Sequence, residues 1–254
     1  MHKATVRRTL SRVMQLGVLS LLAQHAFAAC DFESAKKPGA ANPQQLNVLL
    51  VGATGMIGSR ILTEATSRGH CVIAGARSPE KIKAGPNVKA VKLDATDQAA
   101  LLEQAKKADV IVSATSPRGG GDPSKEANAV AAAEISVAKG LGKRLVVVGG
   151  AGSLNMPDGK AVVDTLPPQY QGEARAMRGV LDSLKATDID WTFFSPAMSI
   201  SPGKRTTSYQ LGTTTVLYGA DKKSAISAED FAHALVNELE KPAHHKSQMT
   251  IANR

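Results

Sequence analysis

The sequence is poor in cysteine and in aromatic residues. Two cysteines among 254 residues are too few for a disulfide-rich scaffold or a zinc site built on several cysteines. Aromatic residues make up only 4% of the chain, which argues against a surface built on base stacking. No apolar run approaches the roughly 20 residues that a stable membrane-spanning helix needs. What remains is a 43% hydrophobic content, which is typical of a globular domain.

Acidic residues are fewer than basic ones, 22 against 31, which gives a formal charge of +9. Four of the positive charges, Lys3, Arg7, Arg8 and Arg12, fall within residues 1–28, which contain no acidic residue. The remaining lysines and arginines are scattered along the chain. We therefore expect a solvated, mildly basic surface and no nucleic-acid partner.

The N-terminus has the pattern of an export signal. A basic stretch leads into the apolar run VMQLGVLSLLA, and Ala26 and Ala28 then occupy the small-residue positions that a signal peptidase needs. We expect residues 1–28 to be this signal and the protein to be exported, to the periplasm. Two refinements stay open: the pair Arg7-Arg8 resembles a twin-arginine signal, and Cys30 is a candidate lipidation site, although Phe27 is a poor match to the lipobox.

Residues 29–45 contain Pro, Gly, Asn and Gln without apolar periodicity, and are predicted to be a flexible linker. Residues 46–254 are expected to form one domain. Short apolar runs, predicted to be buried strands, fall at 46–52, 71–76, 88–93, 109–114, 144–150 and 190–195. Amphipathic stretches, predicted to be helices, fall between or after them at 57–68, 97–107, 124–140, 170–186 and 228–240.

This alternation favours an α/β fold, a Rossmann-type doubly wound parallel sheet with helices on both faces. The pattern changes after residue 196. Residues 202–219 are rich in Gly, Thr, Ser and Tyr and are expected to form a hairpin or irregular strands. Residues 248–252 are a candidate last strand.

The segment VLLVGATGMIGSRIL, residues 48–62, joins the first predicted strand to the first predicted helix through three glycines. Gly52 permits the tight turn, Gly55 lets the main chain approach a pyrophosphate, and Gly58 lets the helix pack closely on the strand. The N–H groups at the start of the helix would face the phosphates. The predicted phosphate-binding set is Gly52, Thr54, Gly55, Met56, Ile57 and Gly58.

The second predicted strand ends in Ala76-Arg77-Ser78, where an NAD site would place an Asp or Glu for the ribose hydroxyls. Arg77 is instead positioned to bind a 2′-phosphate with its planar donor fork, and Lys81 adds a second charge nearby. The competing interpretation is an ordinary surface arginine. The sequence therefore favours NADP(H) over NAD(H).

Further segments carry a resemblance to a known group. They are GATGMIG, GARSPEKI after the second strand, LDATD after the third, VVVGGAGSL at the fifth, DWTFFSPA at the sixth, and the helix ISAEDFAHALVNELE. Together they resemble atypical short-chain dehydrogenases/reductases of the NmrA-like and NADH-flavin-reductase-like group, which includes biliverdin reductase B. The resemblance covers residues 46–252 and does not fix the subgroup function.

The resemblance implies roles for residues at the carboxyl ends of the strands, where ligands bind in open α/β sheets. Asp94 and Ala95 would meet the adenine. The residues expected along the central part of the cofactor are Ser113, Ala114 and Thr115. Those expected around the nicotinamide are Gly150, Ala151, Gly152, Ser153, Ser195, Pro196 and Ala197.

The chain departs from the main short-chain dehydrogenases at the Tyr-x-x-x-Lys pair. The best-placed tyrosine is Tyr170, and the residue four positions later is Ala174. A ketone reductase needs that pair to deliver a proton to the developing alkoxide. A flavin or quinone spreads the charge by conjugation and can take its proton from water. Ser153 and Tyr170 remain candidate hydrogen-bond donors at the reaction site, or else a loop-capping serine and a packed tyrosine.

The function favoured by these observations is an NADPH-dependent reductase of a flavin, a quinone or another conjugated acceptor. The alternative is a non-catalytic NADP(H)-binding sensor or partner-binding protein of the NmrA type, and an isomerase or dehydratase is disfavoured by the missing Tyr-Lys pair. The six histidines show no metal-ligand spacing, so no metal is expected. Cys71 is expected to be an inert, partly buried thiol.

Overall fold

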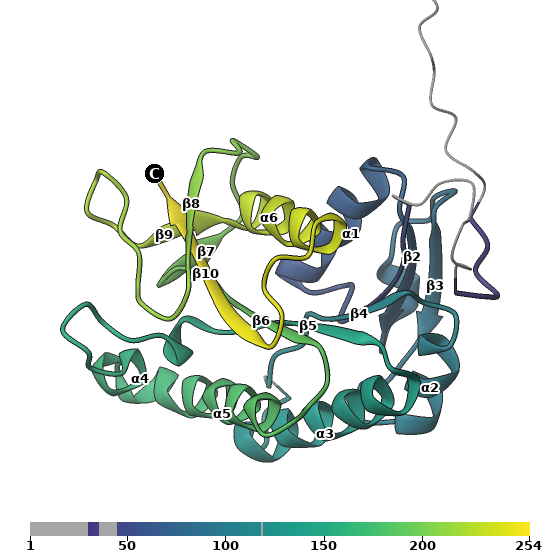
Figure 1. The fold of residues 1–254 in the computed structure, drawn as a ribbon, viewed down its shortest axis with the longest axis horizontal. Coiled ribbons are helices and arrows are strands. Elements are labelled where there is room, and N and C mark those ends of the chain that lie inside the picture. The colour runs from purple at the N-terminus through teal and green to yellow at the C-terminus, as the bar shows by residue number, and fades with distance from the viewer. Residues whose placement is uncertain (1–29, 36–44, 118) are drawn as a thin grey trace, which may run out of the picture.

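The computed structural model describes residues 30–35, 45–117 and 119–254 (Figure 1). The predicted export signal, with the pair Arg7-Arg8, lies outside the described residues, as does most of the predicted linker.

The centre of the molecule is an eight-stranded sheet in the order β3-β2-β1-β4-β5-β6-β10-β8 (Figure 1). Its strands are β1 (Asn47–Val51), β2 (Cys71–Ala76), β3 (Val88–Lys92), β4 (Val110–Ser113), β5 (Arg144–Val148), β6 (Trp191–Ser195), β8 (Tyr209–Gly212) and β10 (Ser247–Asn253). All neighbours pair in parallel except β8, which is antiparallel to β10. The Rossmann-type sheet predicted from the sequence is therefore confirmed.

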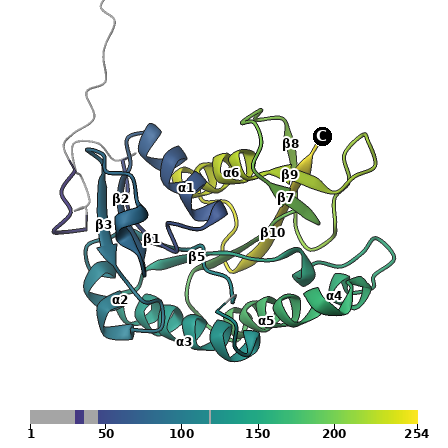
Figure 2. The same cartoon turned by 180° about the vertical axis from the view of Figure 1, so that it is seen from behind.

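Helices cover both faces of the sheet, as Figure 2 shows from behind. One face carries α1 (Met56–Ser67) and α6 (Ala228–Glu240), which pack on each other. The other face carries α2 (Gln98–Ala105), α3 (Pro123–Leu141) and α5 (Pro168–Lys185). Alternate side chains of β1 enter the two layers: Val48 and Leu50 pack with α1 and α6, and Leu49 and Val51 pack under α2 and α3.

Shorter elements complete the carboxyl-end side of the sheet. Residues 151–153 form a 3₁₀ turn, and α4 (Val162–Thr165) follows it. The strands β7 (Ser199–Ser201) and β9 (Ala225–Ser227) pair in parallel as a separate ribbon. A further 3₁₀ turn, Pro79–Lys81, follows β2.

Residues 202–219 do not form a hairpin of their own. They contribute β8, which pairs with β10 from Thr250↔Gly212 to Asn253↔Tyr209. The main-chain hydrogen-bond partners of β8 come from the edge of β10, which is distant in sequence. The local pattern of glycine and threonine does not reveal this pairing.

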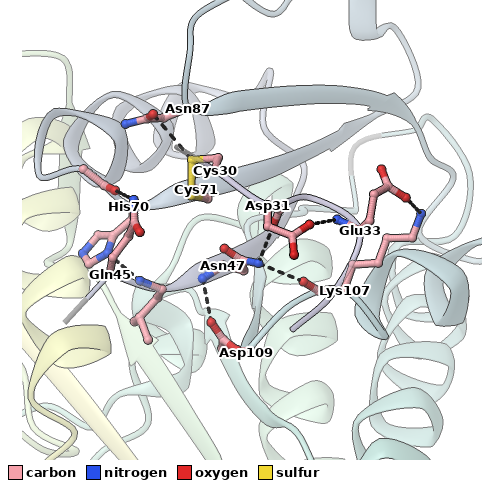
Figure 3. The surroundings of a disulfide bond; sticks show 12 residues. Cys30, Asp31, Glu33, Gln45, Asn47, His70, Cys71, Asn87, Lys107 and Asp109 are labelled. Carbon is pink, nitrogen blue, oxygen red and sulfur yellow. Dashed lines mark hydrogen bonds and ion pairs between the residues drawn. A yellow bond between two sulfur atoms is a disulfide. The ribbon is translucent and has the colours of Figure 1, made fainter. Parts of the chain in front are cut away.

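The expectation of a free thiol at Cys71 is wrong, because Cys71 forms a disulfide with Cys30 (Figure 3). Cys71 is the first residue of β2 and is fully buried. Next to it, the Asn47 side-chain amide donates a hydrogen bond to the main-chain oxygen of Asp31 at 2.8 Å (Figure 3). The same amide donates to the main-chain oxygen of Ser34 at 2.9 Å. Residues 30–35 are thereby fixed at the amino ends of the strands. A thioether to lipid would need the same Cys30 sulfur, so the disulfide and lipidation exclude each other.

Candidate cofactor and acceptor cavities

The glycine turn between β1 and α1 has the geometry that its sequence predicts. Gly52 has a φ of +84°, and a Cβ on it would lie 2.6 Å from the main-chain oxygen of Ala114. A Cβ on Gly58 would lie 2.1 Å from the main-chain oxygen of Gly52. The structural reasons predicted for both glycines, the turn and the close packing, are therefore confirmed.

Gly55 differs from these two glycines. Its φ is −68°, and the nearest atom to a Cβ placed on it would be the Gly52 oxygen at 3.4 Å. The fold itself therefore tolerates a side chain at position 55. The missing side chain leaves space in front of the N-terminus of α1, where a pyrophosphate would need it.

A cavity of about 360 Å³, which we call cavity A, lies along the carboxyl ends of β1, β2 and β4. Ten of the residues predicted to bind the cofactor line it: Gly52, Thr54, Gly55, Arg77, Lys81, Asp94, Ala95, Ser113, Ala114 and Thr115. Arg77 and Lys81 are exposed at its rim. The cavity thus combines a glycine turn with two cations, a combination that fits the phosphates of a nicotinamide dinucleotide.

Asp94 is held as an anion at the rim of cavity A. The main-chain N–H and the hydroxyl of Thr96 bind its carboxylate at 2.9 and 2.7 Å and keep its pKa below the ordinary value, and Arg77 adds a smaller effect in the same direction. A fixed anion at this position suits the exocyclic amine of adenine, which is a hydrogen-bond donor.

A second cavity of about 480 Å³, cavity B, adjoins the first. The two share the lining residues Gly55, Ala114, Thr115, Ser116 and Met177. The predicted residues that line only cavity B are Met56, Ile57, Gly150, Ala151, Gly152, Tyr170, Pro196 and Ala197. Met56, Tyr170 and Met198 are exposed large hydrophobic side chains that line it, so the cavity offers apolar surface to a planar ligand.

Ser153 lies apart from both cavities and is only 4% exposed. Its hydroxyl donates to the main-chain oxygen of Gly150 at 2.7 Å and contacts the Ser195 hydroxyl at 2.8 Å. The Gln248 side-chain amide donates to both serines, at 3.0 and 2.9 Å. This cluster ties the loop after β5 to β6 and β10, and neither Ser153 nor Ser195 lines either cavity. Gly58 also lines neither cavity, in keeping with its packing role.

Tyr170 is the predicted donor that the structure does place at cavity B. It lies near the start of α5 and is 59% exposed. Ala174, four residues later, lines the same cavity. The guanidinium group of Arg175 forms an ion pair with the Asp164 carboxylate at 3.2 Å. No lysine stands beside Tyr170 among the described residues that line the cavity.

Sequence reasoning missed Glu134, which lines cavity A from α3. It is 2% exposed, and burial raises its pKa to about 8 against a smaller opposing effect of the Ser113 hydroxyl. The signal was available: Glu134 falls on the helix stripe that otherwise holds Ala127, Ala131 and Ala138, all buried. An acid at a core position of a helix is a candidate functional group.

Within residues 30–35, 45–117 and 119–254 there is no group of three His, Cys, Asp or Glu side chains that could hold a metal. None of the helices in these ranges has the length and hydrophobicity to cross a membrane.

Comparison with known proteins agrees with this geometry. A family model described as NAD(P)H-binding matches residues 52–242. A solved structure titled "Putative exported protein" from Burkholderia pseudomallei is 40% identical, with a TM-score of 0.73, over 82% of this chain and 100% of that one. A "putative epimerase" from Bacteroides thetaiotaomicron is 36% identical, with a TM-score of 0.75, over 82% of this chain and 96% of that one. A "putative NADH-flavin reductase" from Streptococcus pneumoniae is 28% identical, with a TM-score of 0.70, over 82% of this chain and 100% of that one. The chain therefore belongs to the NAD(P)H-binding, NmrA-like family of Rossmann-type proteins.

Proposed function

We propose that this protein is an NADPH-dependent reductase that passes a hydride to a flavin, a quinone or another conjugated acceptor. The observation that carries the proposal is the junction of the two cavities. Cavity A has the turn and the cations for a dinucleotide, and it meets the apolar cavity B at Gly55, Ala114 and Thr115. A nicotinamide at that junction would face a planar acceptor across a short gap.

The preference for NADP(H) rests on Arg77 and Lys81. Both line cavity A directly after β2, and Ala76, Arg77 and Ser78 provide no carboxylate there for a ribose 2′-hydroxyl. A 2′-phosphate would gain a bidentate contact from the guanidinium and a point charge from the ammonium.

The chemistry divides between the cofactor and the chain. The cofactor, when bound, supplies a hydride. The chain holds it at the glycine turn, with Gly150, Ala151 and Pro196 beside the acceptor cavity. Met56, Tyr170 and Met198 present apolar surface that would orient a flat acceptor and displace water from it.

The second candidate is a non-catalytic NADP(H)-binding sensor. Two observations favour it: no lysine accompanies Tyr170 among the described cavity residues, and the Ser153 hydroxyl is fully engaged within the protein. An isomerase or dehydratase is disfavoured by the same missing Tyr-Lys pair.

The test uses the protein from residue 29 onward. Cofactor that co-purifies is identified first, and NADPH oxidation is then followed with FMN, FAD and quinones. Stereospecific loss of label from NADPH deuterated on one face shows enzymatic hydride transfer. Tight NADPH binding with no acceptor reduced faster than the buffer blank supports the sensor instead.

Gly55→Val provides the matched control. Its Cβ fits the protein but would occupy the place of the pyrophosphate, so the variant is expected to fold and to lose both NADPH binding and turnover. Circular dichroism and thermal unfolding would check that folding is retained. A Gly55→Val protein that still binds NADPH contradicts the assignment of cavity A.

We also propose that the protein is exported to the periplasm after removal of residues 1–28. The Cys30–Cys71 disulfide supports this, because such bonds persist in oxidising compartments. The 40% identical protein from Burkholderia pseudomallei is named an exported protein, which points the same way. Folding around the cofactor before export by the twin-arginine route would explain how a cytoplasmic cofactor reaches the periplasm.

A further inference from the structure

A short series of polar side chains leads from a buried acid to the place where the two cavities meet. Glu134 on α3 and Ser113, the last residue of β4, both line cavity A, and the Ser113 hydroxyl acts on the Glu134 carboxyl group as a polar neighbour that lowers its pKa. The Ser113 hydroxyl lies 3.3 Å from the hydroxyl of Thr115. Thr115 lines both cavities, whereas Ser113 and Glu134 line only cavity A.

The acid at the inner end of this series is not explained by packing. One carboxyl oxygen of Glu134, Oε1, is buried and has no hydrogen-bond partner among the described residues. A buried carboxylate in that state would be very costly, whereas a protonated carboxyl group is neutral and can donate. The neighbouring positions on the same stripe of α3 are alanines, so an apolar residue would have satisfied the fold.

The surroundings of Glu134 keep it neutral. Among the residues that line cavity A together with Glu134 are Ser113 from β4, Val147 from β5, and Met177 and Val180 from α5. The charged residues that line the same cavity are Arg77, Lys81, Asp94 and Glu126. None of these four is buried, and none contributes to the shift of the Glu134 pKa, which comes from burial opposed by Ser113.

We infer that Glu134, Ser113 and Thr115 form a proton relay that delivers the proton accompanying hydride transfer to the acceptor. This inference rests on the proposed reductase function. The nicotinamide cofactor provides the hydride and is oxidised, and the acceptor gains two electrons. The reduced acceptor takes a proton from the Thr115 hydroxyl, Thr115 is reprotonated by Ser113, and Ser113 by the Glu134 carboxyl group. Glu134 is left as a carboxylate and regains a proton from solvent after the product leaves.

The relay takes the place that the Tyr-Lys pair occupies in the main short-chain dehydrogenases. It differs in using a neutral acid behind two hydroxyls, because hydroxyl groups can both accept and donate a proton. Its proton comes from inside the protein, so reduction would not depend on water entering the apolar cavity B.

The first experiment measures protonation without any turnover. Infrared difference spectroscopy on the cofactor-free protein should show a protonated carboxyl group at pH 7 that titrates near pH 8. Glu134→Gln should lose this signal. Glu126→Gln is the matched control, since Glu126 lies on the same helix and lines the same cavity but is outside the series, and this variant should keep the signal.

The second experiment measures the rate of acceptor reduction with menadione, a naphthoquinone, and with FMN. In the unchanged protein kcat should fall above about pH 8. Glu134→Gln should lower kcat by about 100-fold, the lower range for a general acid, remove this pH dependence and leave the Kd for NADPH unchanged. Thr115→Val should act like Glu134→Gln, and Thr115→Ser, which keeps a hydroxyl, should restore the rate. Glu103→Gln, which changes an exposed carboxylate on α2 that lines neither cavity, should behave like the unchanged protein.

The outcomes separate the relay from the reductase function. If the protein reduces acceptors and Glu134→Gln keeps both the rate and the pH dependence, the relay is refuted and the reductase stands. A missing carboxyl signal at pH 7 refutes the relay in the same way. If no acceptor is reduced by the unchanged protein, the proposed function fails and the relay fails with it, even where the carboxyl signal is present.

Discussion

Removing the Cys30–Cys71 disulfide should destabilise the protein by about 4 kcal/mol. The two cysteines are 41 residues apart in sequence. In the chain-entropy model, a closed loop of that length removes roughly 13 cal/mol/K of entropy from the unfolded state, which is about 4 kcal/mol at 25 °C. Cys30→Ala is the cleaner variant, because Cys71 is fully buried and a change there would also disturb the packing around β2.

The free energy of unfolding would be measured by urea denaturation of residues 29–254 in oxidised and reduced form. We expect the oxidised protein to be the more stable, and the reduced protein to match Cys30→Ala. Reductant should have no effect on Cys30→Ala, which is the control. If mass spectrometry confirms the disulfide and the variant still loses less than about 1 kcal/mol, the entropic reasoning is refuted, and the hydrogen bonds of Asn47 would be the main support of residues 30–35.

Three further predictions concern the cofactor, the buried acid and export. Arg77→Ala should weaken NADPH binding by roughly 1.5–3 kcal/mol and leave NADH binding unchanged in fluorescence titrations, and equal losses for both would remove Arg77 from the 2′-phosphate site. The folded-state pKa of Glu134, about 8, lies above its ordinary value of 4.5, so between these pH values the folded protein holds a proton that the unfolded protein has lost. The free energy of unfolding should therefore fall as the pH rises from 4.5 to 8, by at most about 1.4 kcal/mol per pH unit. Urea titrations at several pH values should show that Glu134→Gln lacks this pH-dependent contribution. If the free energies of unfolding of the variant and the unchanged protein change in parallel with pH, the raised pKa of Glu134 is contradicted. Arg7→Lys with Arg8→Lys should leave unprocessed protein in the cytoplasm with Cys30 and Cys71 both reduced, and recovery of processed protein outside the inner membrane would refute folded export.

Much of the sheet could be predicted because its strands are buried on both faces. Runs such as LNVLLVG and RLVVVGG are apolar and β-branched for that reason, and they coincide with β1 and β5. The edge of the sheet formed by β8 could not be predicted in this way. The strand β8 is only partly buried, and its pairing with β10 depends on how the chain returns, which no local pattern encodes.

The same distinction applies to the site. The glycine turn could be predicted because Gly52 and Gly58 are required by backbone contacts that any chain in this conformation would meet. The Cys30–Cys71 bond depends on the path of residues 30–35 back to the amino end of β2, which is a tertiary property. Glu134 carried a readable signal, an acid within an alanine stripe, but its significance depends on Ser113 and on the depth of the cavity.

The position of β10 has a consequence for the order in which the protein matures. Strands β1 to β5 are adjacent in the sheet and follow one another within residues 47–148, so this half of the sheet is formed by contacts among early parts of the chain. The other half needs β10 between β6 and β8, and Gln248 must reach Ser153 and Ser195. Because β10 follows every other strand of the sheet in sequence, it leaves the ribosome after them, and this half of the sheet is completed later than the half formed by β1 to β5. Synthesis would thus build the two halves of the sheet one after the other.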